Sequence, residues 1–390
     1  MNIALVGIGG YGHAYIEFFQ KELPSSCRLM AAVEPYPELS PAAVAWLKES
    51  GIPLYPDLDS LYASQMPELV ILSTPIPLHK KQAIFCMEHG SHVLCEKPLV
   101  PSLADAKELK EAQQRTGKKL GVGFQWSFSD TMLGLKKDLM DGVLGRPLLF
   151  KTHISWCRPE SYYTGSSWKG RIRNEAGDLV NDSILTNATA HYLHNVFFIN
   201  GPAMDLAARP IRLSGCLGRT YPIETYDTCF IRGTLENGCE FLHIATHSAE
   251  TNSEPKLEYR FENACVYYDS NLDPTLYAVF KDGSRKEYGK PLSLHETSQK
   301  VSRMTEAVEN DTVPCCHIQT VLPHLVATAA IQEQLPVLSY PEADLCLRFR
   351  DNGWYHYTRH LYEETVRCYE EECLPSRETA VSLTSADWQI

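Results

Sequence analysis

The chain has 390 residues, of which 44% are hydrophobic and 22% are charged, which is typical of a globular protein of about two domains. Its formal net charge of −12 argues against nucleic acid or an anionic membrane surface as the main partner. No apolar run approaches the roughly 20 residues that span a bilayer. The first residues lack a signal-peptide pattern, so we expect a cytoplasmic protein. The 13 scattered cysteines show no Cys-x-x-Cys spacing, which favours reduced thiols over disulfides or a metal site.

The first residues follow the order strand, glycine-rich turn, helix. Ile3–Ile8 is a continuous apolar run, as in a parallel strand buried on both faces, and a helix is expected over His13–Lys21. Three glycines allow a tight turn, close approach of a pyrophosphate to the backbone, and close helix–strand packing, with the phosphates at the positive end of the helix dipole. The pattern predicts a dinucleotide site formed by Gly7, Ile8, Gly9, Gly10, Tyr11 and Gly12.

A second strand, Leu29–Val33, ends at Glu34. An acidic residue at this point binds the adenosine ribose hydroxyls, and its charge repels a 2′-phosphate. Glu34 therefore favours NAD over NADP. The alternative interpretation is that Glu34 only initiates the turn before Pro35.

Strands and helices continue to alternate as far as residue 123. This alternation predicts a doubly wound parallel sheet, so we assign residues 1–123 to a Rossmann domain. Helices are expected over Pro41–Ser50, Leu78–His89 and Ser102–Arg115, and strands over Ile52–Tyr55, Leu69–Leu72, His92–Leu94 and Leu120–Phe124.

The strand His92–Leu94 leads directly into Glu96-Lys97-Pro98. A lysine at the carboxyl end of such a strand points into the crevice where α/β sheets bind ligands, and Pro98 stiffens the turn. Partial desolvation lowers the pKa of a lysine toward the working pH, so that it can transfer protons. Taken alone, the motif is more often a solvated lysine before a helix. The dinucleotide loop upstream favours the catalytic interpretation.

After residue 123 the pattern changes to that of an α+β domain, which we assign to residues 124–390. Hairpin turns at Asn237-Gly238, Glu262-Asn263 and Asp282-Gly283 predict a largely antiparallel sheet. We expect this domain to bind substrate and to form oligomers, and we expect no regular structure in the last residues. Other expected elements are helices over Asp130–Asp141, Glu296–Glu309, Thr320–Glu333 and Trp354–Glu372, and a strand over Leu148–Trp156.

With these motifs the chain resembles the Gfo/Idh/MocA oxidoreductase family over roughly residues 1–335. The motifs are the glycine loop, Ser73-Thr74-Pro75 with His79, the stretch from His92 to Pro98, Leu144-Gly145-Arg146, and the stretch from Asn187 to Asn195. The resemblance implies a nicotinamide cofactor, a sugar or polyol substrate, and a homodimer or homotetramer formed through the C-terminal sheet. It adds to the cofactor site Ser73, Thr74, Pro75, His79, Glu96, Lys97 and Gln125.

The last family motif normally reads Asp, three residues, His, two residues, Asp. Here the three positions are Asn187, His191 and His194, whose spacing places them on one helix face. An asparagine can form hydrogen bonds but cannot accept a proton, and Asp182 is the candidate for the missing acid. The resemblance implies that Lys97 and His191 are catalytic and that Asn187 orients a substrate hydroxyl. For His194 we favour a structural contact.

Further substrate-binding candidates are aromatic or basic. Trp168 and Lys169 precede the histidine motif, and Trp126 follows the strand that ends at Phe124. The alternative for each is packing in the core. Side chains that can stack on a sugar face are Trp156, Tyr162 and Tyr163.

These observations favour an NAD-dependent oxidoreductase acting on a secondary alcohol of a sugar, glycoside or cyclitol. One alternative is a glycosidase that oxidises its substrate only transiently and returns the hydride, with no net NADH. Another is a dinucleotide-binding regulator without catalysis, which the asparagine at position 187 favours and the retention of Lys97 and His191 disfavours.

Overall fold

A computed structural model describes residues 1–21, 27–383 and 385–388, and the chain forms two compact units. The first comprises Met1–Ser129 and Leu292–Thr320, and the second comprises Asp130–Pro291 and the described residues that follow Thr320. We predicted a single boundary after residue 123. The later segment returns to the first unit, where its helix α9 (Ser298–Glu309) packs against strand β5 (His92–Cys95). We missed this return because a contact between such distant segments leaves no local pattern in the sequence.

The first unit contains a six-stranded parallel sheet in the order β3-β2-β1-β4-β5-β6. The strand order reverses between β1 and β4, and an open α/β sheet binds ligands at such a point. The fold class predicted for this domain is therefore confirmed. The strands are β1 (Asn2–Val6), β2 (Arg28–Val33), β3 (Leu54–Tyr55), β4 (Leu69–Leu72), β5 (His92–Cys95) and β6 (Leu120–Val122).

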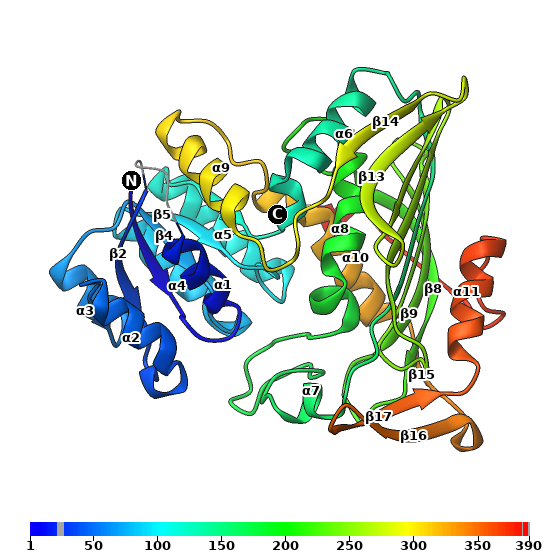
Figure 1. The fold of residues 1–390 in the computed structure, drawn as a ribbon, viewed down its shortest axis with the longest axis horizontal. Coiled ribbons are helices and arrows are strands. Elements are labelled where there is room, and N and C mark those ends of the chain that lie inside the picture. The colour runs from blue at the N-terminus through cyan, green and yellow to red at the C-terminus, as the bar shows by residue number, and fades with distance from the viewer. Residues whose placement is uncertain (22–26, 384, 389–390) are drawn as a thin grey trace. The chain divides into compact units, whose positions relative to one another are not determined.

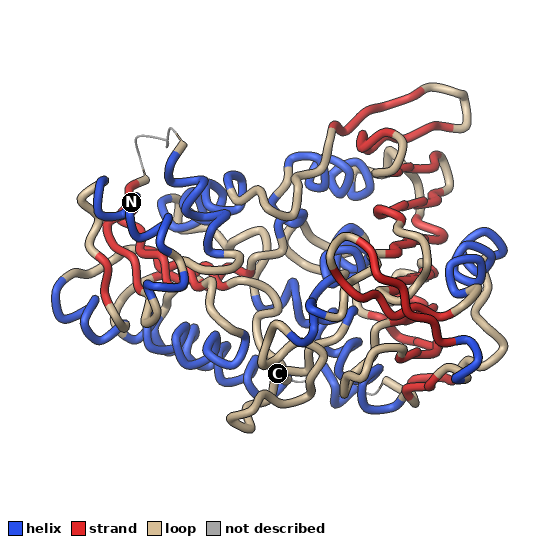
Figure 2. Tube along the Cα trace, turned by 60° about the horizontal axis from the view of Figure 1, so that its bottom comes forward, coloured by secondary structure: helices blue, strands red, loops and turns tan. Residues whose placement is uncertain are grey.

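Helices lie on both faces of this parallel sheet (Figure 2). Helix α5 begins as predicted, because the Ser102 Oγ accepts a hydrogen bond from the Asp105 backbone N–H at 3.1 Å. It ends at Gly117, whose φ is +67°. Helix α3 was not predicted. The helices are α1 (Gly12–Gln20), α2 (Pro41–Glu49), α3 (Leu58–Ser64), α4 (Ile76–Glu88) and α5 (Leu103–Thr116).

The second unit contains a mostly antiparallel sheet in the order β14-β13-β12-β11-β7-β10-β9-β8-β15, with β18 beside β8. The three predicted hairpin turns join β9 to β10, β11 to β12 and β13 to β14. The strands are β7 (Pro147–Ser155), β8 (Pro210–Arg219), β9 (Thr228–Leu235), β10 (Glu240–Thr246), β11 (Ser253–Phe261), β12 (Ala264–Asp269), β13 (Asp273–Phe280), β14 (Arg285–Gly289), β15 (Val337–Ser339) and β18 (Thr379–Val381).

Both faces of the second sheet carry helices. Helix α8 lies on one face and helix α11 on the other (Figure 1). The apolar side of α11 is buried against residues of β8, β9 and β10, namely Cys216, Phe230, Leu242 and Ile244. The helices are α6 (Asp130–Met140), α7 (Ser161–Thr164), α8 (Ala190–Ile199), α10 (Ile318–Gln334) and α11 (Leu361–Glu371).

The helical tail predicted over Trp354–Glu372 was wrong in its first half. Strands β16 (Leu345–Arg350) and β17 (Gly353–Thr358) form a hairpin there, and only α11 is helical. Asp351 and Asn352 have φ values of 49° and 59°, as a two-residue hairpin turn requires, and the aromatic run in β17 favours a strand. Strand β18 forms where we expected no regular structure, whereas residues 384 and 389–390 lie outside the described part.

The 13 cysteines are free thiols. Within the described ranges, no helix is both long enough and apolar enough to cross a membrane.

Candidate active site

The glycine-rich loop connects β1 to α1 at the switch point of the parallel sheet. Gly7 has φ +85°, and a Cβ there would lie 2.5 Å from the Ser73 carbonyl oxygen. A Cβ at Gly12 would lie 2.2 Å from the Gly7 carbonyl oxygen, so helix and strand pack too closely for any other residue. Around Gly10 the space is open, and no side chain caps the N-terminus of α1. The loop therefore fits a dinucleotide, with its pyrophosphate at the helix N-terminus.

Glu34 lies at the end of β2, where the sequence predicted a ribose-binding acid. Its carboxylate accepts hydrogen bonds from the backbone N–H groups of Ile8 (3.2 Å) and Tyr36 (3.1 Å). These bonds hold the carboxylate beside the glycine loop. This position suits a carboxylate that accepts hydrogen bonds from the ribose hydroxyls, the role that the sequence predicted for Glu34.

His79 joins the loops that follow β4 and β5. Its Nε2 lies 2.8 Å from the Thr74 carbonyl oxygen, and its Nδ1 lies 3.0 Å from the Pro98 carbonyl oxygen. The ring is only 1% exposed, and burial lowers its pKa. We predicted His79 as a cofactor contact; its two ring nitrogens face backbone carbonyl oxygens, and the neutral ring can donate a hydrogen bond to one of them. The structure therefore places His79 as a residue that positions two cofactor-site loops.

Lys97 lies at the turn after β5, half-buried, at the carboxyl edge of the parallel sheet. The preceding Glu96 is buried, and its carboxylate accepts hydrogen bonds from the Tyr15 hydroxyl (2.6 Å) and the Lys97 backbone N–H (3.2 Å). The same carboxylate forms an ion pair with Lys300 of α9, whose side chain is fully buried. Burial lowers the pKa of Lys300, and the negative Glu96 opposes that shift. The turn that carries Lys97 is thus fixed by a buried charged cluster.

Gln125 and Trp126 follow β6, as expected, but their surroundings differ from the prediction. The Gln125 side-chain amide donates to the Tyr11 hydroxyl and to the Leu294 carbonyl oxygen, which ties it to the glycine loop. The Trp126 ring is 3% exposed, and its Nε1 donates to the Leu292 carbonyl oxygen at 3.0 Å. Trp126 therefore packs inside the first unit. This agrees with core packing, which we gave as the alternative to substrate binding.

In the second unit, the buried Asp182 pairs with the half-buried Asn187. The Asn187 Nδ2 donates to the Asp182 Oδ1 at 2.8 Å, and the Gly170 backbone N–H donates to the other carboxylate oxygen at 2.6 Å. The side chain of Asp182 is 3% exposed. Position 187 lacks the carboxylate of the family motif, and Asp182 places a carboxylate at hydrogen-bond distance from Asn187 instead.

We predicted that Asn187, His191 and His194 share one helix face, and this was wrong for the first of them. Asn187 lies in a π-helical turn, Ile184–Ala188, which ends before α8 begins at Ala190. Ser183 caps that turn by accepting a hydrogen bond from the Thr186 backbone N–H. The wider turn displaces position 187 from the α-helical spacing, and such turns often occur at functional sites.

His191 and His194 are both buried in α8, 3% and 1% exposed. His194 stacks on Phe198, and its ring lies edge-on to His324. Burial, His324 and Lys136 hold the pKa of His194 well below its usual range. These contacts support the structural role that we favoured for His194. His191 lies in the same helix, three residues before His194, as the motif predicted.

Lys169 lies close to the pair formed by Asp182 and Asn187. Its Nζ lies 4.1 Å from the centre of the Tyr162 ring and 5.9 Å from that of Trp168. Burial lowers the pKa of Lys169, Asp182 opposes this shift and Arg158 adds to it. A lysine and aromatic rings around a carboxylate can bind a hydroxylated ligand.

Sequence reasoning missed Lys300 and Tyr15, which fix Glu96. Both side chains are buried, Tyr15 in the helix that follows the glycine loop and Lys300 in α9, and Lys300 is 204 positions from its partner. A lysine on the apolar side of α9, beside Val301 and Met304, was the only available signal.

A parallel sheet with a dinucleotide loop, followed by a mostly antiparallel sheet, defines a two-domain fold whose first domain carries a dinucleotide-binding site. Residues 1–124 match the family model described as the Gfo/Idh/MocA oxidoreductase family, NAD-binding Rossmann fold. Over these residues the chain matches that family, as the motifs predicted, and the family description confirms the NAD cofactor that we predicted for this domain.

The chain is also similar to curated proteins and to solved structures. It is 32% identical to inositol 2-dehydrogenase of Streptomyces avermitilis over 177 residues, which are 45% of this chain and 51% of that protein. It is 33% identical to 2,7-anhydro-N-acetylneuraminate hydratase of Mediterraneibacter gnavus over 178 residues, 45% of each chain. The chain therefore spans about half the length of these relatives. The fold matches levoglucosan dehydrogenase in complex with NADH and levoglucosan, with TM-score 0.69, 17% identity, and 85% and 95% of the two chains covered.

Proposed function

We propose that the protein is an NAD-dependent oxidoreductase acting on a secondary alcohol, or the corresponding ketone, of a sugar, glycoside or cyclitol. The observation that carries the proposal is Lys97, held by the buried Glu96 cluster at the ligand-binding edge of the sheet that bears the glycine loop. The inositol 2-dehydrogenase relative supports the substrate class.

In this proposal NAD accepts or supplies the hydride, and the side chains of the chain handle the proton and the substrate. Lys97 takes the hydroxyl proton on oxidation and returns it on reduction. His191 hydrogen-bonds the reacting oxygen. Asn187 orients a neighbouring hydroxyl, while Asp182 fixes the amide of Asn187 through the 2.8 Å hydrogen bond.

The test is a screen of sugars, glycosides and cyclitols for NADH formation with the purified chain. At least one polyol should reduce NAD, and Lys97→Met should abolish the signal while NAD still binds. A screen with no NADH from any substrate, in either direction, would contradict the proposal.

A second candidate is transient oxidation, in which the hydride returns to the product and no NADH accumulates. It is supported by the similarity to a hydratase, because its name describes a reaction with no net oxidation. Release of a glycoside's aglycone, or addition of water, with catalytic amounts of NAD and no NADH would select this candidate.

We further propose that any homodimer or homotetramer formed through the second sheet uses strands other than β7 to β10, because α11 also packs against β7, where the His153 Nε2 lies 3.0 Å from the Thr365 Oγ1. Helix α11 already covers those strands on one face, with Leu361, Cys368 and Tyr369 buried. Light scattering after size-exclusion chromatography measures the assembly. A monomer would show that α11 occupies the surface that a partner would need.

The 13 free thiols support the expected cytoplasmic location.

A further inference from the structure

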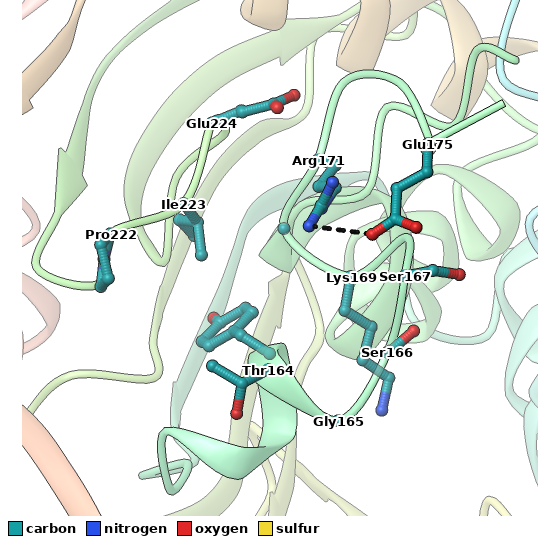
Figure 3. A pocket seen from close by; sticks show the side chains of 12 residues that line it. Thr164, Gly165, Ser166, Ser167, Lys169, Arg171, Glu175, Pro222, Ile223 and Glu224 are labelled. Carbon is teal, nitrogen blue, oxygen red and sulfur yellow. Dashed lines mark ion pairs between the residues drawn. The ribbon is translucent and has the colours of Figure 1, made fainter. Parts of the chain in front are cut away.

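The second unit contains a cavity of about 540 Å³, and its wall includes two of the predicted substrate-binding candidates, Tyr163 and Lys169. It lies between the segment 163–175 and the loop 222–224 (Figure 3). Lys169 and Ser166 lie on one side, Arg171 and Glu175 on another, and Pro222, Ile223 and Glu224 on the facing loop. The volume falls within the range of about 300–1,000 Å³ that is usual for small-molecule sites.

The charges around the cavity compensate one another. Arg171 forms an ion pair with Glu175 at 3.6 Å. The Glu224 carboxylate accepts a hydrogen bond from the Ile172 backbone N–H at 2.8 Å. Lys169 is the other cation of the wall, so that two basic and two acidic side chains line the cavity, and the remaining polar side chains carry hydroxyls, those of Thr164, Ser166 and Ser167 among them. A wall with balanced charge and many hydroxyls suits a neutral polyhydroxylated ligand better than an anion, which needs an unbalanced cation.

The cavity also has an aromatic wall. The Tyr163 hydroxyl lies 2.7 Å from the His247 Nδ1 and is therefore engaged away from the cavity. What Tyr163 offers is its ring, which lies so close to Gly170 that a Cβ there would be 3.0 Å from it. An aromatic ring packs well against the apolar face of a sugar ring.

Gly170 connects this cavity to the pair formed by Asp182 and Asn187. Its N–H donates to Asp182 at 2.6 Å, and its carbonyl oxygen accepts from the Glu224 backbone N–H at 2.9 Å. It has φ +70°, and a Cβ would lie 2.7 Å from Ile223, so only glycine fits. Gly170 thus links the cavity wall, through Glu224, to Asp182, the hydrogen-bond partner of Asn187.

From this arrangement we infer that the cavity is a subsite for a second, neutral glycosyl unit, attached to the sugar ring that Asn187 orients. This inference rests on the proposed function. It narrows the substrate class to glycosides and disaccharides, with the ring that is oxidised near Asn187 and the second ring on Tyr163.

The test compares monosaccharides with disaccharides as substrates of the full-length protein. The probes are glucose and galactose, then cellobiose, lactose, maltose and trehalose, and uronic-acid analogues of the disaccharides. At least one neutral disaccharide should have a KM lower than its monosaccharide by about tenfold or more, the usual effect of a filled extra pocket. Equal KM values for both lengths, or a preference for the uronic acids, would overturn the inference.

A pair of matched variants assigns the effect to the cavity. Ser167→Trp fills the cavity from its wall, so it should weaken disaccharides about tenfold more than monosaccharides. Ser161→Trp, an exposed serine of α7 that does not line the cavity, should change neither. Equal losses for both substrate lengths in Ser167→Trp would contradict the subsite.

Calorimetric binding of the best disaccharide to Lys97→Met separates this inference from the proposed function. Binding that Ser167→Trp weakens, together with a parent protein that reduces no NAD with any substrate, would refute the oxidoreductase and leave the cavity as a glycan site. NADH formation without any effect of disaccharide length or of Ser167→Trp would refute the subsite alone.

Discussion

The hydrogen bond between Asn187 and Asp182 makes a sharp prediction for Asn187→Asp. In the parent, the amide donates to the buried carboxylate at 2.8 Å. The substitution replaces that donor by a second carboxylate at nearly the same place. Two charges this close repel by about 6 kcal/mol at an effective dielectric constant of about 20. The pair will therefore keep one proton in the folded state.

The size of the effect follows from the proton that the pair retains. Paired carboxylates separate their pKa values by about 3 units, and each unit is worth about 1.4 kcal/mol. One carboxyl thus has a folded-state pKa raised above its unfolded value of about 3.9. The variant is destabilised little below about pH 4, and the cost grows to about 3–4 kcal/mol as the pH rises to neutrality.

The assay is urea unfolding of the parent and the variant at about pH 4 and about pH 7.5. Asn187→Ala is the control that removes the hydrogen bond without adding charge, and it should cost about 1–3 kcal/mol at both pH values. The exchange variant, Asn187→Asp with Asp182→Asn, restores one amide and one carboxylate and should recover most of the loss. A pH-independent cost in Asn187→Asp, or no recovery in the exchange variant, would refute the pairing.

Three further predictions concern the charged cluster, the cofactor loop and the tail. Lys300→Met leaves the buried Glu96 without its ion-pair partner and should lower the free energy of unfolding by about 3–5 kcal/mol, measured by urea titration; a loss below about 1 kcal/mol would contradict the buried pair. Glu34→Ala should weaken NAD by about 10–100-fold and NADP much less, measured by fluorescence titration; equal losses would contradict its role at the ribose. Leu361→Ala should cost about 2–5 kcal/mol, measured by thermal or urea unfolding, because α11 buries this side chain against the second sheet; an unchanged stability would contradict that packing.

The glycine loop could be predicted from the sequence because its requirements are local. A positive φ at Gly7 and the close approach of Gly12 to the Gly7 carbonyl oxygen leave no alternative residue. Lys97 was found in the same way, from a strand that runs into its motif.

The features that could not be predicted from the sequence depend on contacts between distant segments. Lys300 joins Glu96 only because α9 returns to the first unit, and periodicity carries no information on such a return. The tail was misread because the helical pattern of α11 was extended back over the aromatic residues of β17, which pair with β16 across the turn at Asp351 and Asn352. Asp182 was proposed as the missing acid, but its bond to Asn187 depends on a π-helical turn that no spacing rule contains.

The most direct test of the proposed chemistry is the turnover of Lys97→Met with a polyol that the parent oxidises. NAD affinity, measured separately, should stay within a few-fold of the parent value. The rate of NADH formation should fall by about 10²–10⁴-fold, the usual cost of losing an acid/base group, and Lys97→Arg should not restore it. Turnover within a few-fold of the parent in Lys97→Met would show that another group moves the proton.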